Sequence, residues 1–327
     1  MAKNTLLTLA KIGVGMALLV VILGAYTRLV DAGLGCPDWP GCYGFLTVPE
    51  SVEDVALASS RFPDAPVEQD KAWWEMIHRY FATALGAFVL GMAVVAYRNR
   101  GQGTPTKLPF ALLILVILQG AFGAWTVTLK LWPQVVTAHL LGGFATLSLL
   151  WLLCLRLGLG ARWQAPRELR GLAAVGLGVL ILQIALGGWV TSNYAALACP
   201  DFPTCHGEWL PDMNLSQAFD VTQSVGPNYL GGLLESDARV GIQVVHRLGA
   251  VVVLLAIGLL GFRLLQAASP LAWPLLGLLT VQLLLGVLNV VLVLPLANAT
   301  AHNAFGALLL LAMVTVNYRA RVGSGPH

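Results

Sequence analysis

The chain has 327 residues, of which 57% are hydrophobic and 11% are charged, with a formal net charge of +3. Soluble domains average about 25% charged residues, so this composition indicates a membrane protein. The sequence has no basic cluster with interleaved aromatic residues, no Walker lysine and no glycine-rich phosphate loop. It therefore gives no signal for nucleic-acid binding or nucleotide hydrolysis.

Eight apolar segments are long enough to cross a hydrocarbon core of about 30 Å as helices. In chain order they span about 9–29, 72–97, 108–130, 134–157, 169–192, 239–264, 271–294 and 299–319. The first segment, with Lys3 and Lys11 before its apolar run, also has the pattern of a signal peptide. We interpret it as a retained helix, because it has an internal counterpart later in the chain. The sequence predicts an all-α integral membrane protein with eight transmembrane helices.

The charges of the connecting segments predict the orientation. Basic residues follow the second, fourth, sixth and eighth segments, whereas the two long loops are acidic. Under the positive-inside rule, both termini are cytoplasmic and the long loops face outward. We therefore expect a multi-pass protein of the inner membrane whose cysteine loops lie in the periplasm, if the source is Gram-negative.

The two halves of the chain repeat the same motifs. Cys36-Pro-Asp-Trp-Pro-Gly-Cys42 recurs 163 residues later as Cys199-Pro-Asp-Phe-Pro-Thr-Cys205, and Thr137-Ala-His139 recurs as Thr300-Ala-His302. The same spacing relates Gly24 to Gly187, Gln119 to Gln282, and Gly123 to Gly286. Four segments separate the copies, so both insert with the same orientation. We expect two tandem four-helix bundles, residues 1–160 and 161–327, with parallel pseudo-twofold symmetry.

Four of the six histidines lie in the predicted helices, near their outward ends. They are His78 and His139 in the first half, and His246 and His302 in the second. Polar side chains inside a membrane are costly and usually functional. Zinc takes three or four ligands, more than each half offers, whereas two imidazoles on facing helices can hold one haem iron. The pattern favours a bis-histidine haem site in each half; hydrogen bonds that join the helices are the alternative.

One charged position differs between the halves. Glu75 lies three residues before His78 on the same helix face, and Gln243 occupies the equivalent position before His246. A desolvated carboxylate beside one porphyrin is suited to proton transfer or to stabilising positive charge. The alternative is a water-exposed residue at the start of the helix, where the helix dipole favours an acid.

Three arginines lie near the same outward ends. Arg79 and Arg247 directly follow histidines, and Arg28 ends the first segment. Because a guanidinium fork matches a carboxylate, these arginines are candidates to bind haem propionates. The alternative is that they extend to the membrane interface, as long basic side chains do near helix ends.

Four of the five cysteines form two C-x₅-C pairs in the outward loops. The Pro-Asp-aromatic-Pro sequence between them favours a tight turn, and an oxidising compartment makes the disulfides Cys36–Cys42 and Cys199–Cys205 the first expectation. Four cysteines allow three connectivities, and a zinc site or thiol exchange are the alternatives. Cys154 is alone within its helix and is interpreted as a packing residue.

Together these motifs resemble the haem A synthase family over nearly the whole chain. Thr27-Arg28 and the segment from Gly33 to Pro40 are similar to the first outer segment of that family. Glu75-Met-Ile-His78-Arg79 is similar to its Glu-x-x-His-Arg motif, and the other helix-borne histidines fall where the family places its own.

The resemblance implies an enzyme that oxidises the C8 methyl group of haem O to a formyl group by successive hydroxylations, which supplies haem A to terminal oxidases. It implies that His246 and His302 bind a cofactor haem b (iron protoporphyrin IX). It also implies that His78 and His139 bind the iron of the substrate haem, and that Glu75 is catalytic. The implied partners are the lipid bilayer, the farnesyltransferase that produces haem O, and assembly factors of cytochrome oxidase.

Two other classes of function fit part of the pattern. A di-haem cytochrome that only carries electrons explains the four histidines but leaves the difference between Glu75 and Gln243 unexplained. A transporter explains the parallel repeat, but it predicts polar groups and broken helices at the membrane midplane. The histidines lie near one face and the central spans lack charge. The enzyme is therefore the favoured interpretation.

Overall fold

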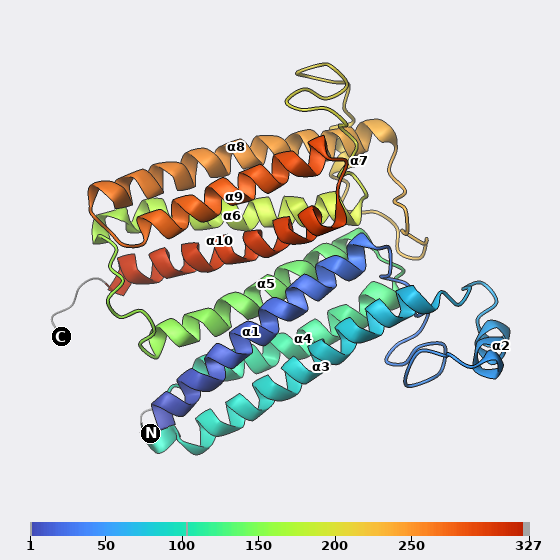
Figure 1. Cartoon of the computed structure of the whole chain (residues 1–327), viewed down its shortest axis with the longest axis horizontal. Helices are drawn as coiled ribbons and strands as arrows, with labels where there is room; N and C mark the ends of the chain where they lie inside the picture. Colours follow the sequence, from blue (N-terminus) through green and yellow to red (C-terminus); the bar gives the residue numbers. More distant parts are fainter. Residues whose placement is uncertain (1, 103, 323–327) are drawn as a thin grey trace.

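The described part of the chain, residues 2–102 and 104–322 of a computed structural model, is helical and contains no β-strand. Within this part, eight helices are long and apolar enough to cross a membrane (Figure 1). They are α1 (Ala2–Leu29), α3 (Gln69–Arg98), α4 (Lys107–Thr128), α5 (Pro133–Arg156), α6 (Arg170–Ser192), α8 (Ser236–Gln266), α9 (Ala272–Val291) and α10 (Leu296–Val322). These helices confirm the prediction of an all-α, multi-pass membrane protein.

Short helices lie in the connections. They are α2 (Val52–Arg61) and α7 (Leu215–Ala218) in the long loops, and the 3₁₀ turns η1 (Arg100–Gln102) and η2 (Arg167–Leu169). α2 begins where the Ser51 hydroxyl accepts a hydrogen bond from the backbone N–H of Asp54 at 3.0 Å, a common helix N-cap. Hydropathy does not predict these elements, because it detects only long apolar spans.

Four of the long helices begin at least three residues earlier than the apolar segments that predict them. α1 begins at Ala2 rather than near residue 9, α3 at Gln69 rather than 72, α8 at Ser236 rather than 239, and α10 at Leu296 rather than 299. Helical hydrogen bonds continue into the polar region, whereas hydropathy detects only the stretch that fits hydrocarbon. The histidines of α3 and α8 therefore lie roughly three turns inside their helices.

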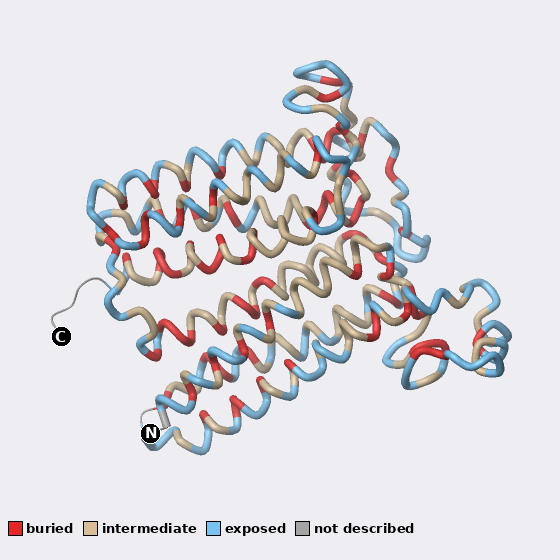
Figure 2. The backbone as a smooth tube through the Cα atoms, in the orientation of Figure 1, coloured by how far each residue is buried: buried red, intermediate tan, exposed pale blue. Residues whose placement is uncertain are grey.

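The long helices pack around a leucine-rich interior. α3 and α5 each contact both α1 and α4, and α8 and α10 each contact both α6 and α9. In addition, α5 contacts α6 and α10, and α1 contacts α10. Leu147, Leu150 and Leu260 are fully buried, whereas Figure 2 shows exposed residues along the outer faces of the helices. Many of these are apolar, as with Ile117 (65% exposed) and Leu255 (66%), which is the surface that lipid requires.

The start of α1 and the end of α10 lie at one end of the helices, and both long loops lie at the other (Figure 1). This is the relative arrangement that the loop charges predict. The basic residues Arg98, Arg156 and Arg263 lie in the last turns of α3, α5 and α8, at the end away from the long loops.

The second long loop crosses to the turn between α4 and α5. The indole N–H of Trp132 donates to the carbonyl of Gln223 at 3.1 Å, and the backbone N–H of Tyr229 donates to the carbonyl of Lys130 at 3.0 Å. These contacts join residues about a hundred positions apart in the sequence and tie the loop before α8 to the helix that carries His139.

Candidate functional site

The structure places the four helix-borne histidines in two pairs. His78 of α3 and His139 of α5 are close enough to interact electrostatically, and so are His246 of α8 and His302 of α10. All four side chains lie in the part of their helices nearer the long loops. The imidazoles of each half are therefore within electrostatic range of one another, and their pairing around one iron stays a prediction.

Each imidazole packs against a glycine of a neighbouring helix. The Cε1 atoms of the histidines lie 2.9 to 3.5 Å from the position that a Cβ at the glycine would occupy. The pairs are Gly24 with His78, Gly123 with His139, Gly187 with His246, and Gly286 with His302. A Cβ at Gly24 or Gly286 would press on the ring, whereas one at Gly123 or Gly187 would be in ordinary van der Waals contact with it. The repeat spacing marks all four glycines, but only the structure reveals their contacts.

Carboxamides contact the histidines of α8 and α10. The Nε2 atom of Gln183 in α6 lies 3.2 Å from Nδ1 of His246, and it donates to the carbonyl of the same residue at 2.9 Å. The Nε2 atom of Gln282 in α9 lies 3.3 Å from Nε2 of His302. Sequence reasoning missed Gln183; the signal that it overlooked is a polar side chain inside an apolar span, which is costly without a function.

Three of the imidazoles have a buried Nδ1 atom that lacks a hydrogen-bond partner among the described residues. They are those of His78, His139 and His302. Leaving a buried polar atom unpaired costs free energy, about 1–3 kcal/mol for a typical group. Such atoms are expected where a ligand or water completes the site.

Glu75 is buried beside His78 and has two partners. Its carboxylate accepts a hydrogen bond from the backbone N–H of Cys36 at 2.9 Å, and it forms an ion pair with Arg79 one turn further along α3. The interpretation as a water-exposed carboxylate at the helix start is therefore wrong. Gln243, the equivalent residue of α8, is equally buried at 5% exposure, so the two positions differ in charge rather than in accessibility.

Arg79 and Arg247 hold the two cysteine loops. Arg79 donates to three backbone carbonyls of the first loop at 2.6 to 3.3 Å, and Arg247 donates to three of the second at 2.8 to 3.0 Å. The acceptors are the carbonyls of Asp38, Pro40 and Gly41, and of Cys199, Asp201 and Thr204. Arg28 donates to the carbonyl of Thr191 at 2.6 Å and lies 4.0 Å from the centroid of the Tyr194 ring. A role of these arginines with propionates stays a prediction, but the structure gives each of them a partner within the protein.

Both predicted disulfides are present among the described residues. Cys36 bonds to Cys42 and Cys199 to Cys205, with Cα–Cα distances of 4.8 and 4.7 Å. An aspartate closes each turn: the carboxylate of Asp201 accepts from the Thr204 hydroxyl and from two backbone N–H groups. These hydrogen bonds lower the pKa of Asp201 to about 2, with the Thr204 hydroxyl as the largest cause.

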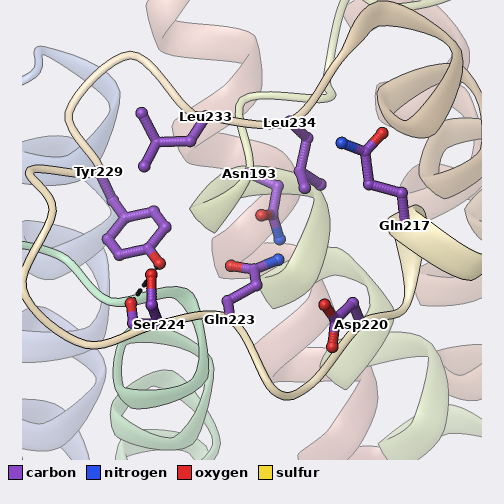
Figure 3. A pocket seen from close by; sticks show the side chains of 8 residues that line it. All are labelled: Asn193, Gln217, Asp220, Gln223, Ser224, Tyr229, Leu233 and Leu234. Carbon is purple, nitrogen blue, oxygen red and sulfur yellow. Dashed lines mark hydrogen bonds between the residues drawn. The ribbon is translucent and has the colours of Figure 1, made fainter.

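A polar cavity of about 230 Å³ lies under the second long loop, apart from the histidines. Its lining is formed by Asn193, Gln217, Asp220, Gln223, Ser224, Tyr229, Leu233 and Leu234 (Figure 3). The hydroxyl of Tyr229 donates to the carbonyl of Ser224 at 2.5 Å, which closes the loop on itself. None of the residues predicted as functional lines this cavity.

Comparison with known proteins places the chain in a family. The sequence profile described as cytochrome oxidase assembly protein (COX15-CtaA) matches residues 8–314. The chain belongs to this family. It is 47% identical over 315 residues to the heme A synthase of Shewanella oneidensis, which covers 95% of both chains. It is also similar to the heme A synthases of Beijerinckia indica (30% identity, 93% of this chain and 89% of the relative) and of a Chelativorans species (29%, 94% and 88%).

Proposed function

We propose that the chain is a haem A synthase, which oxidises the C8 methyl group of haem O to a formyl group by successive hydroxylations and so supplies haem A to terminal oxidases. The relatives of this name match it almost end to end. The observation in the structure that carries the proposal is the buried Glu75 beside one pair of histidines, with a neutral Gln243 beside the other. A protein that only transfers electrons has no need of this difference.

The architecture that we propose is a tandem duplication, residues 1–160 and 161–327, with two four-helix bundles related by a parallel pseudo-twofold axis. The contacts between long helices support it. Exchanging α1 with α6, α3 with α8, α4 with α9, and α5 with α10 converts the set of contacting helix pairs into itself. This exchange converts the contact between α5 and α10 into itself, as expected for two helices that lie on either side of the axis.

In the second bundle, His246 and His302 would hold a resident haem b. The residues fit such a group: the imidazoles of α8 and α10 lie within electrostatic range of one another, each lies beside a glycine, and Nδ1 of His302 is buried without a hydrogen-bond partner among the residues described. A bound haem supplies one-electron oxidation and reduction. The protein supplies the ligands, their orientation and an apolar surrounding.

In the first bundle, His78 and His139 would hold the iron of the substrate haem O. Glu75 is kept in place by the N–H of Cys36 and by Arg79, so its carboxylate is fixed before substrate binds. A preorganised negative charge in an environment without water stabilises positive charge that develops at the methyl carbon during oxidation. If water rather than dioxygen supplies the oxygen, the same carboxylate can accept a proton from the water as it adds to this carbon.

The location that we propose is the inner membrane, with cytoplasmic termini and periplasmic cysteine loops. The disulfides support an oxidising compartment for these loops, and the basic helix ends support the opposite orientation for the termini. The proposed partners are haem O, the bilayer, the farnesyltransferase that makes haem O, and assembly factors of cytochrome oxidase.

The test is the conversion of haem O by the purified protein and by its Glu75→Gln variant, with Gln243→Ala as the matched control. Loss of a preorganised charge costs about 10²- to 10³-fold in rate, so Glu75→Gln should bind haem O but form almost no formyl haem. Gln243→Ala should retain conversion. Chromatography and mass spectrometry of the extracted pigments separate haem O from haem A. Wild-type rates of haem A formation by Glu75→Gln would reject the proposed role.

A further inference from the structure

The contact between Gln183 and His246 has no counterpart beside His78. The amide nitrogen of Gln183 lies 3.2 Å from Nδ1 of His246 and 2.9 Å from its carbonyl oxygen. Val20 stands at the equivalent position of α1, 163 residues earlier, and only its backbone carbonyl, not its side chain, can hydrogen-bond His78. Nδ1 of His78 therefore has no side-chain partner in the described part of the chain.

A second position differs together with the first. Gly249 lies one turn after His246, and a Cβ at this glycine would overlap Oε1 of Gln183. A side chain at residue 249 would therefore displace the carboxamide from its present position. The equivalent residue of α3, three positions after His78, is Phe81. The second half thus combines a glutamine with a glycine where the first half combines a valine with a phenylalanine.

A hydrogen bond to the non-coordinating nitrogen fixes the tautomer and the ring plane of a histidine ligand and changes its basicity. The amide nitrogen of Gln183 donates to the carbonyl of His246 and also lies beside Nδ1 of its ring, so the carboxamide is held against the imidazole and restricts the ring plane. A glutamine in an apolar span is costly, which favours such a use over packing alone.

We propose that Gln183 is a positioning residue that makes the His246 site a permanent haem site, and that Val20 leaves His78 as an exchangeable ligand for a substrate haem that must leave as product. This inference rests on the proposed function, because it assumes that haem binds between the paired histidines. It assigns the difference between resident and exchangeable haem to one hydrogen bond and to the glycine that makes room for it.

The experiment compares haem b binding by full-length wild type, Gln183→Val and the control Leu182→Val, in detergent and without haem O. Leu182 is adjacent in α6 but 67% exposed on the outer surface. Loss of a partner that orients a ligand typically weakens binding about 10- to 100-fold. We expect Gln183→Val to lose affinity for haem b in this range and to change the electron paramagnetic resonance signal of the low-spin iron, whereas Leu182→Val should match wild type. An unchanged affinity and signal in Gln183→Val would overturn the inference.

A second variant covers the case in which Gln183→Val does not fold. Gln183→Glu keeps the shape of the side chain, and in its ionised form the carboxylate accepts from Nδ1–H, which increases the electron donation of the imidazole. We expect its haem b to have a lower midpoint potential than that of wild type, and an unchanged potential would contradict the positioning role. A different result would contradict the proposed function: wild-type protein that binds no haem b through two histidine ligands.

Discussion

The two halves of the molecule share a scaffold and differ in the residues that surround their histidines. The first half has a buried carboxylate, Glu75, where the second has Gln243. The second half has a carboxamide on its α8 histidine, from Gln183, where the first has Val20. The charge is beside the site proposed for the substrate, and the ligand contact is beside the site proposed for the cofactor. A few side chains at repeat-related positions thus distinguish the surroundings of the two histidine pairs.

Removing a proposed iron ligand from each half should break the comparison most strongly. In His246→Ala, haem b content should fall by more than about tenfold, because losing a ligand is at least as severe as losing a residue that orients one. In His78→Ala, haem b should stay bound while haem O binding and haem A formation are lost. Optical spectra and pigment extraction of the two purified variants measure both haems. Equal loss of haem b in the two variants would show that the halves do not have separate roles.

The glycines beside the histidines provide a test of smaller effect. A Cβ at Gly24 would lie 2.9 Å from Cε1 of His78, whereas one at Gly187 would lie 3.4 Å from Cε1 of His246. Overpacking costs typically about 1–3 kcal/mol, so Gly24→Ala should lower the thermal unfolding temperature or displace His78. Gly187→Ala, whose contact is close to an ordinary van der Waals distance, should have a smaller effect. Thermal unfolding in detergent compares them, and a larger loss in Gly187→Ala would contradict the geometry.

The smallest expected effect concerns the second cysteine loop. The pKa of Asp201 is about 2, lowered from its usual 3.8 by the Thr204 hydroxyl and by loop N–H groups. Because the folded pKa is lower than the unfolded pKa, the ionised carboxylate stabilises the loop at pH values above about 4. This contribution is lost as the pH falls from about 4 toward 2. Asp201→Asn should therefore speed hydrogen exchange of the N–H groups of His206 and Gly207 near neutral pH. Mass spectrometry should find little difference from wild type near pH 2, and equal protection at neutral pH would reject this role of the carboxylate.

Much of the scaffold could be predicted from the sequence, because its determinants are local. Runs of apolar residues define the long helices, and C-x₅-C pairs in loops define the disulfides, both of which the structure bears out. The contacts of Gln183 and Gly249 could not be predicted, since they depend on how α6 packs against α8. The hydrogen bond from the Trp132 indole to the Gln223 carbonyl could not be predicted either, because it joins a tight turn to a polar loop with no regular pattern.

The arginines illustrate the limit of reasoning from residue type. A guanidinium group near a histidine can match a propionate or extend to the membrane interface, and the sequence leaves both partners open. In the structure, Arg79 and Arg247 donate to backbone carbonyls of the cysteine loops, and a propionate partner stays a prediction. The loops offer several carbonyls in a tight turn, an acceptor arrangement that becomes visible only after the turn has folded. Arg79 also pairs with Glu75, so the first loop and the proposed catalytic carboxylate are held by the same side chain.

The most direct test of the account is an electron cryomicroscopy map of the purified protein as isolated with its haem. We expect a porphyrin between α8 and α10 whose iron is bound by His246 and His302, and a second porphyrin between His78 and His139 after haem O is added. Porphyrin density outside both histidine pairs, or histidine pairs closed against each other with no porphyrin between them, would contradict it.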